Sequence, residues 1–261
     1  MQLPIYQVDA FADRVFRGNP AAVCPLEAWL PDATMQGIAA ENNLSETAFF
    51  VRQGSDYALR WFTPTIEVDL CGHATLAAGH IVFRFLEPQR DSVRFHTAKA
   101  GTLVVTRRAD MLVMDFPTRP AVPVAAPPGL FAALGGTPRE VLRARDHLVV
   151  YGSAAEVAAL KPDLAALARV DCWAVIVTAP GENGVDFVSR FFAPAQGVPE
   201  DPVTGSAHCT LLPYWAKRLG KTEFEARQLS RRGGALRCTL DGDRVSIAGR
   251  VVLYLEGRIA V

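Results

Sequence analysis

The chain has 261 residues, of which 50% are apolar and 21% are charged, and its 27 basic residues balance 27 acidic ones. This is the composition of a globular protein, with length enough for one large domain or two smaller ones. Zero net charge without a stripe of Lys and Arg argues against a nucleic-acid partner. The first residues do not form a signal peptide, and no apolar run reaches the roughly 18 residues that span a bilayer. We therefore expect a cytoplasmic protein with no membrane partner.

The first part of the chain predicts a set of strands interrupted by two helices. β-branched, aromatic or alternating residues predict strands near 3–8, 46–52, 57–62, 92–96, 101–107 and 110–116. Helices are predicted near 32–42 and from Gly72 through Phe83. The proline-dense segment 117–129 cannot hold a helix or a central strand, so we interpret it as the connection between two domains.

A similar order of elements follows this connection. Helices are predicted near 129–143, 153–169 and 204–219. Strands are predicted near 147–151, 172–178 and 185–192, followed by three closing strands.

The two parts also share sequence. The segment Arg60-Trp-Phe-Thr-Pro64 matches Arg190-Phe-Phe-Ala-Pro194 at an offset of 130 residues, and Gly72 matches Gly205 at an offset of 133. Because the offset of 133 residues is kept by the residues that follow these two glycines, the pattern indicates an internal duplication. We predict an N-terminal half of residues 1–117, to which the last strand, 251–261, can return, and a C-terminal half of residues 118–250. The cleft between such halves is the expected ligand site.

Each half has a glycine at the start of its long apolar helix. The first turn of a helix leaves backbone N–H groups unpaired at the positive end of the helix dipole, where anions bind. The candidate donors for a substrate carboxylate are Gly72, His73 and Ala74 in one half and Gly205, Ser206 and Ala207 in the other. The alternative is an ordinary helix start capped by Thr204 and Ser206.

Three titratable residues lie near these helix starts. Asp201 precedes a proline and is held extended close to the second start, where it could hold a polar substrate group or be a plain turn residue. His73 could carry protons near neutral pH, and the positive helix end should keep it neutral. Glu46 stands where a polar stretch becomes an apolar strand. If the strand is half buried, desolvation would raise the pKa of Glu46 and make it a useful general acid or base. The alternative is that Glu46 faces water.

The remaining motifs narrow the chemistry. The five cysteines are odd in number and widely spaced, which indicates neither a disulfide framework nor a zinc site, and only Cys71 lies at a probable helix start. The signatures of dinucleotide, phosphate-loop, zinc-protease and α/β-hydrolase sites are missing. The sequence therefore favours proton chemistry without a metal or organic cofactor.

At these residues the chain resembles the PhzF-like (phenazine biosynthesis) family, which has the diaminopimelate epimerase fold. Four blocks over nearly the whole length carry the resemblance: Val8-Asp-Ala-Phe-Ala with Gly18-Asn-Pro-Ala-Ala-Val23, Asn43-Leu-Ser-Glu46-Thr-Ala-Phe, Cys71-Gly-His-Ala-Thr-Leu-Ala, and Gly197-Val-Pro-Glu-Asp-Pro-Val-Thr-Gly-Ser-Ala207. It implies an α+β fold of two pseudo-symmetric halves, each a curled, mostly antiparallel sheet around a central helix.

The resemblance also implies roles for residues. Glu46 would transfer the proton, with His73 and Asp201 assisting. The substrate carboxylate would be held by Ser45, Gly72, Ala74, Gly205, Ser206 and Ala207. Members of the family are typically homodimers without a metal or cofactor, so we expect a homodimer that takes a small carboxylate.

Related epimerases use two opposing cysteines, one at each helix start. Cys71 matches the first position, but Thr204 occupies the second, and a threonine hydroxyl is too weak an acid to serve as that base unaided. The sequence thus favours a one-base isomerase acting through Glu46. The alternatives are a racemase, epimerase or dehydratase that uses Cys71, and a small-molecule binding protein without turnover.

Overall fold

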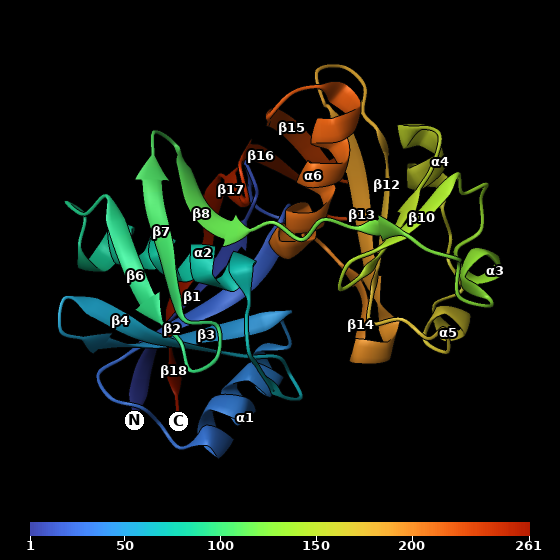
Figure 1. The fold of residues 1–261 in the computed structure, drawn as a ribbon. Helices are drawn as coiled ribbons and strands as arrows, with labels where there is room; N and C mark the ends of the chain where they lie inside the picture. The colour runs from blue at the N-terminus through green and yellow to red at the C-terminus, as the bar shows by residue number, and fades with distance from the viewer. The chain divides into compact units, whose positions relative to one another are not determined.

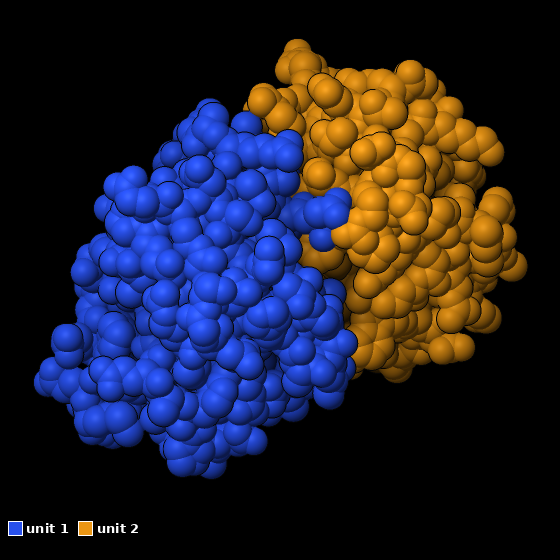
Figure 2. Space-filling model, turned by 60° about the vertical axis from the view of Figure 1, so that its left-hand side comes forward, with its two compact units in different colours: residues 1–115, 248–261 blue, residues 116–247 orange.

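The computed structural model describes residues 1–261, which divide into two compact units. Unit 1 comprises residues 1–115 and 248–261, and unit 2 comprises residues 116–247; Figure 2 colours them blue and orange. Strand β8 (Met111–Pro117) leads the chain into unit 2, and β17 (Arg244–Gly249) leads it back. None of the helices combines the length and the apolar character that crossing a bilayer would need.

Unit 1 is built on a sheet whose strands are mostly antiparallel. Besides β8, its strands are β1 (Gln2–Ala10), β2 (Asn19–Leu26), β3 (Glu46–Gln53), β4 (Asp56–Phe62), β5 (Glu67–Val68), β6 (Ser92–His96), β7 (Thr102–Arg108) and β18 (Val251–Ala260). Only the pairs β2–β3 and β4–β6 are parallel. The last strand, β18, pairs along nearly its whole length with β1.

Helix α2 (Gly72–Ile81) is the central helix of unit 1, and it continues as a π-helical turn, η1 (Val82–Leu86). It contacts β1, β2, β3 and β7, so the sheet curls around it (Figure 1). Small residues make this possible: a Cβ on Gly79 would lie 2.7 Å from Val105 Cγ1 of β7. Helix α1 (Asp32–Asn42) packs Met35 and Ile38 against the opposite face of the sheet.

Unit 2 repeats the pairing pattern of unit 1. Its strands are β9 (Val122–Pro123), β10 (Glu140–Arg143), β11 (His147–Val150), β12 (Val175–Pro180), β13 (Phe187–Ala193), β14 (Val198–Asp201), β15 (Glu223–Gln228), β16 (Gly234–Asp241) and β17. The parallel pairs are β11–β12 and β13–β15, at the places that β2–β3 and β4–β6 have in unit 1. Antiparallel pairs separate them in both units.

The helices of unit 2 also lie on two faces. After a 3-10 turn, η3 (Gly205–Ala207), helix α6 (His208–Leu219) buries Trp215, whose ring stacks on Phe187 at 5.7 Å. The short helices α3 (Leu130–Leu134), α4 (Ala154–Ala159) and α5 (Leu164–Leu167) belong to a separate hydrophobic core. A 3-10 turn, η2 (Pro194–Gln196), follows β13.

The sequence match around Arg60 and Arg190 corresponds to a repeated ion pair. Arg60 binds Glu67 through two nitrogens, both at 2.7 Å, and Arg190 binds Glu200 at 2.7 and 3.1 Å. In each unit the pair joins a long strand to the short strand beside it. Arg190 also donates to two backbone carbonyl groups of unit 2, those of Val157 and Leu160.

The α+β prediction is confirmed, but two predicted helices are wrong. The segment 129–143 is helical only as far as Leu134, because Gly135 and Gly136 take positive φ values of 74° and 71° and β10 follows. The segment 153–169 forms two short helices, since Pro162 precludes a continuous helix.

Two further differences concern strands. The chain closes with four strands after α6, β15 to β18, rather than three. Strand β2 was not predicted, because Pro20 and Pro25 argue against a central strand and its residues do not alternate. The structure nevertheless places β2 between β1 and β3, almost wholly buried.

Candidate active site

In unit 1 three chain segments bring polar side chains to one end of α2. Strands β2 and β3 are parallel, so their first residues lie at the same edge of the sheet, with Ala21 beside Glu46. Asn19 begins β2 and Glu46 begins β3. Helix α2, which packs on both strands, begins beside Cys71 and carries His73 in its first turn. The sequence-predicted residues Glu46, His73 and Cys71 therefore lie together.

Glu46 and His73 form a close polar pair in this cluster. Glu46 Oε2 lies 3.1 Å from His73 Nε2, and the two side chains are 16% and 7% exposed. Although they are this close, neither atom makes an aligned hydrogen bond, and both are shielded from solvent. A carboxylate and an imidazole that are buried and not fully bonded are poised for proton transfer to a third group.

Asn19 is a residue of this site that the sequence analysis did not assign. Ser45 Oγ donates to Asn19 Oδ1 at 3.2 Å, which turns the Asn19 amide nitrogen toward His73 Nδ1 at 3.1 Å. This contact fixes the imidazole so that its other nitrogen faces Glu46. Asn19 follows Gly18, where a side chain is impossible because a Cβ would lie 2.1 Å from the Ala10 carbonyl oxygen, at a φ of +65°.

Burial and charge set the protonation of Cys71 and His73. Burial, helped by the Glu46 carboxylate, raises the pKa of Cys71 to about 11, so the side chain is a thiol at neutral pH. Burial opposes charge on His73, but the Cys71 sulfur and the Glu46 carboxylate outweigh it and raise the pKa of His73 well above its usual value. The direction of this pKa shift opposes the expectation that the helix end favours the neutral form, because the Glu46 carboxylate lies 3.1 Å from His73 Nε2.

The same cluster has the composition of a metal site. Ligand atoms of Glu46, Cys71 and His73 all lie within 4.8 Å of one another. A cation there would require the Cys71 thiolate, which burial and Glu46 disfavour. Experiments on this site should therefore include a chelator control.

In unit 2 Asp201 is held by a network that includes a second unassigned residue, Gln228. The Thr204 hydroxyl donates to Asp201 Oδ2. The Gln228 side chain, which is 1% exposed, accepts from the Thr204 backbone N–H at 2.8 Å and donates to the Asp201 carbonyl at 2.7 Å. The network ties Asp201 to the start of η3, and it leaves the Thr204 hydroxyl engaged with a carboxylate instead of capping a helix.

The two helix starts are open to anions to different degrees. Neither Cys71 nor Thr204 makes a side-chain capping bond, so Thr204 does not serve as the cap that the alternative interpretation required. The Ala207 N–H already donates to the Thr204 carbonyl at 3.3 Å. The N–H groups of Gly205 and Ser206 are therefore better placed donors in unit 2 than that of Ala207.

Comparison with known proteins identifies the chain's relatives. The family model described as "Phenazine biosynthesis-like protein" (PhzC-PhzF) matches residues 8–257. An "Uncharacterized isomerase" of Pseudomonas aeruginosa is 54% identical, with 99% of each chain covered. The crystal structure of a PhzF-family phenazine biosynthesis protein from Enterococcus faecalis is 47% identical and superposes with a TM-score of 0.97 over 100% of both chains.

A more distant structure, titled a predicted epimerase of Pseudomonas aeruginosa, shares the fold with a TM-score of 0.75 at 22% identity over 99% of both chains. With its fold and these relatives, the chain is an isomerase of the epimerase-like α+β class. It belongs to the phenazine biosynthesis-like, PhzC-PhzF family. The resemblance drawn from the four sequence blocks is confirmed.

Proposed function

We propose that the protein is a one-base isomerase, independent of cofactors, that moves a proton on a small carboxylate through Glu46. The observation that carries the proposal is the buried pair of Glu46 Oε2 and His73 Nε2, 3.1 Å apart, neither with an aligned hydrogen bond. General acid/base catalysis needs a proton acceptor within reach of the substrate and shielded from water. Glu46 Oε2 is shielded from water, and Glu46 lies beside the first turn of α2, where we propose that the substrate carboxylate binds.

Each member of the cluster has a separate task in this mechanism. The raised pKa of His73 helps the ring keep a proton on Nε2, the nitrogen that lies 3.1 Å from Glu46 Oε2. Asn19 orients the imidazole. Glu46 takes the proton from the carbon next to the substrate carboxylate and returns it to another carbon on the same face. The product is an isomer of the substrate.

Groups of both units are assigned to this one substrate on the strength of the sequence pattern. We propose that Ser45 and the first-turn N–H groups of α2, at Gly72 and Ala74, hold the substrate carboxylate from unit 1. In unit 2 the corresponding groups are Gly205, Ser206 and Ala207, with Asp201 assisting the proton transfer. The expected homodimer and cytoplasmic location also belong to the proposal.

The test is solvent deuterium exchange with Glu46→Gln. A panel of small α-amino, α-hydroxy and unsaturated carboxylates is incubated with the enzyme in D₂O and followed by proton NMR for loss of carbon-bound protons. Exchange by the variant should fall by about 10²–10⁴-fold, the range that general acid/base catalysis contributes. Glu41→Gln, on the exposed end of α1, is the matched control and should exchange at the wild-type rate.

Two results would count against the proposal. Undiminished exchange by Glu46→Gln would remove Glu46 from the mechanism. Loss of exchange after EDTA treatment, restored by a divalent cation, would show that Glu46, Cys71 and His73 act as metal ligands.

One contact favours a second candidate, a Cys71-dependent racemase or epimerase. Cys71 Sγ lies 3.5 Å from His73 Nδ1, a distance at which an imidazole could take the thiol proton. The pKa of about 11 for Cys71 weighs against it. Cys71→Ser should retain most exchange activity under the Glu46 mechanism and lose it under the cysteine mechanism.

A further inference from the structure

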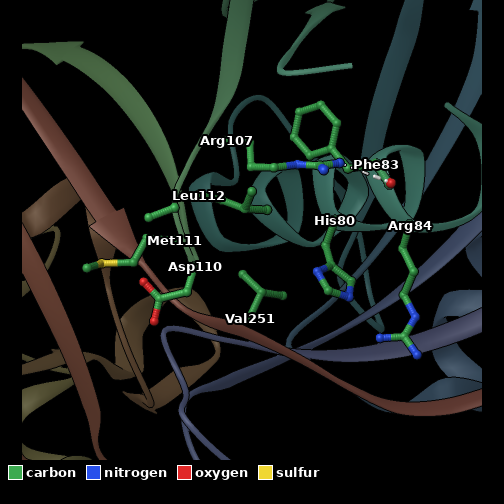
Figure 3. Close-up of a pocket in the computed structure, with 9 residues that line it drawn as sticks. His80, Phe83, Arg84, Arg107, Asp110, Met111, Leu112 and Val251 are labelled. Carbon is green, nitrogen blue, oxygen red and sulfur yellow. Dashed lines mark hydrogen bonds between the residues drawn. The ribbon is translucent and has the colours of Figure 1, made fainter. Parts of the chain in front are cut away.

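A pocket of about 260 Å³ lies in unit 1 at the opposite end of α2 from Glu46. His80, near the end of α2, and Arg84, in η1, are one helical turn apart and belong to the same face of the helix. Arg107 at the end of β7 completes a group of three basic side chains around the pocket (Figure 3). The remaining wall is mostly apolar, formed by Met111, Leu112 and Val251.

The basic groups of this pocket lack anionic partners. His80 Nε2 is buried and makes no hydrogen bond. Arg84 lies over the Phe85 ring, while Arg107 lies over the Phe83 ring and donates to the Phe83 carbonyl at 3.1 Å. Neither guanidinium is within salt-bridge distance of a carboxylate. Burial and the charges of both arginines lower the pKa of His80 to about 4. Positive charge therefore gathers around an imidazole that is itself neutral.

Asp110 is the one acidic residue in the pocket wall, and its charge is already countered. Its Oδ2 accepts a hydrogen bond from Arg250 Nε at 2.5 Å. Figure 3 shows its carboxylate beside Met111, on the side away from Arg84. The end of the pocket formed by His80, Arg84 and Arg107 thus stays cationic.

We propose that this pocket binds a small oxyanion, a phosphate or a carboxylate, whose apolar portion lies against Met111, Leu112 and Val251. Two guanidinium groups and an unpartnered imidazole nitrogen match the acceptor oxygens of such an anion. An α-helix of ten residues is about 15 Å long, so a ligand of this volume cannot also reach Glu46. The pocket is therefore a second ligand site, separate from the one assigned to the isomerase reaction.

The test follows the histidine ring signals of ¹⁵N-labelled protein by NMR, with His80→Gln to assign the His80 signal. Inorganic phosphate tests the anion alone, benzoate adds an apolar ring, and benzyl alcohol supplies the ring without the charge. Phosphate and benzoate should shift the His80 signal to saturation, benzoate at the lower concentration, and benzyl alcohol should not. A His80 signal that neither anion moves, or a shift confined to His73, would overturn the proposal.

A second test compares phosphate binding by variants that lose an arginine charge inside or outside the pocket wall. Arg84→Gln changes an exposed side chain and should weaken phosphate binding about tenfold, with a larger loss in the double variant that adds Arg107→Gln. Arg94→Gln, on β6 with a side chain 65% exposed and outside the pocket wall, should bind like the wild type. Equal binding by Arg84→Gln and the wild type would overturn the proposal even if the double variant does not fold.

Discussion

The two units share the same arrangement of strands around a helix, but they differ in the side chains at the start of that helix. In each, a helix follows a short strand that an Arg–Glu pair holds against a longer one, Arg60–Glu67 in unit 1 and Arg190–Glu200 in unit 2. The strand pairing around the helix repeats as well. The side chains at the helix starts do not repeat.

The differences can be read position by position. In two matching antiparallel pairings, Thr47 of β3 faces Phe62 and Val175 of β12 faces Phe192. The residue before Thr47 is Glu46, whereas the residue before Val175 is Ala174, which is buried and apolar. In unit 2 Asp201 pairs with Phe191, and at the matching position of unit 1 Val68 pairs with Trp61. Each unit thus has one acidic residue that the other replaces with an aliphatic one. The comparison teaches that a duplicated arrangement of strands and helix can be kept while the titratable side chains around the two helix starts differ.

The largest expected effect concerns His73, the group that distinguishes the α2 start most clearly. His73→Gln removes the ring nitrogen that faces Glu46 at 3.1 Å, so exchange in D₂O should fall about 100-fold or more. Ser206→Ala, at the matching position of unit 2, keeps its backbone N–H and should lose far less. Similar losses in the two variants would show that the helix starts contribute alike.

The raised pKa of His73 also makes a prediction about stability. A group whose pKa is higher in the folded state stabilises the protein fully below its unfolded value, near 6.5, and the contribution is lost as pH rises through the folded value. The difference in unfolding free energy between wild type and His73→Gln should therefore be largest in mild acid and shrink above neutral pH. Urea titrations across this range measure it, and a difference that is independent of pH would contradict the assignment.

The repeated ion pairs give the next largest effect, on stability. Arg190 is 11% exposed and also serves two carbonyl groups, whereas the Arg60 side chain is 22% exposed. Arg190→Gln should therefore cost about 2–4 kcal/mol, because it leaves buried acceptors without a donor. Arg60→Gln should cost less than about 1 kcal/mol. Urea unfolding measures both, and equal costs would mean that burial does not separate the pairs.

The two glycines inside helices of unit 1 should respond in opposite directions. Gly79→Ala forces a Cβ into Val105 and should destabilise by about 1–3 kcal/mol. Gly37→Ala in α1 meets no atom within 4 Å and should stabilise by about 0.5–1 kcal/mol, the helix-propensity difference. Thermal unfolding of the two variants compares them directly. Destabilisation by Gly37→Ala would contradict this view of α1.

The smallest expected effect comes from making the helix starts alike. Thr204→Cys recreates a cysteine at each start, yet exchange activity should stay within about twofold of wild type, because the Cys71 thiol holds its proton at neutral pH. Activity measured before and after iodoacetamide treatment tests this. A rise in exchange that Cys71→Ser abolishes would favour the two-base mechanism.

Periodicity predicted the elements whose sequence is locally consistent. Helix α1 and strand β6 have their predicted limits, and Gly72 begins α2 as expected. Prediction failed in two different ways. The helix predicted over 129–143 ends at Leu134, because two glycines with positive φ follow it, and this local signal was overlooked. In β2 the prolines oppose the tertiary structure and concealed a central strand.

The candidate site was predictable where it follows the family's sequence blocks. The sequence assigns Glu46 and His73 to one site and Cys71 to an alternative base, and the structure places the three residues in one cluster. Asn19 and Gln228 were missed because each acts through pairing with residues far away in the chain, 54 residues for Asn19 and His73. Two local signals could have drawn attention to Asn19: it lies in the block Gly18-Asn-Pro-Ala-Ala-Val23, and it follows a tightly packed glycine.

Strand β18 has a consequence for biosynthesis. Unit 2 is one continuous segment, but unit 1 needs β18 to cover β1, and β18 is translated only after all of unit 2. At about 5–20 residues per second, the ribosome takes on the order of ten seconds to make the intervening segment. The unit that holds Glu46 and His73 is thus the last to become complete. A chain that ends before β18 contains all of unit 2, but its strand β1 still lacks the partner strand.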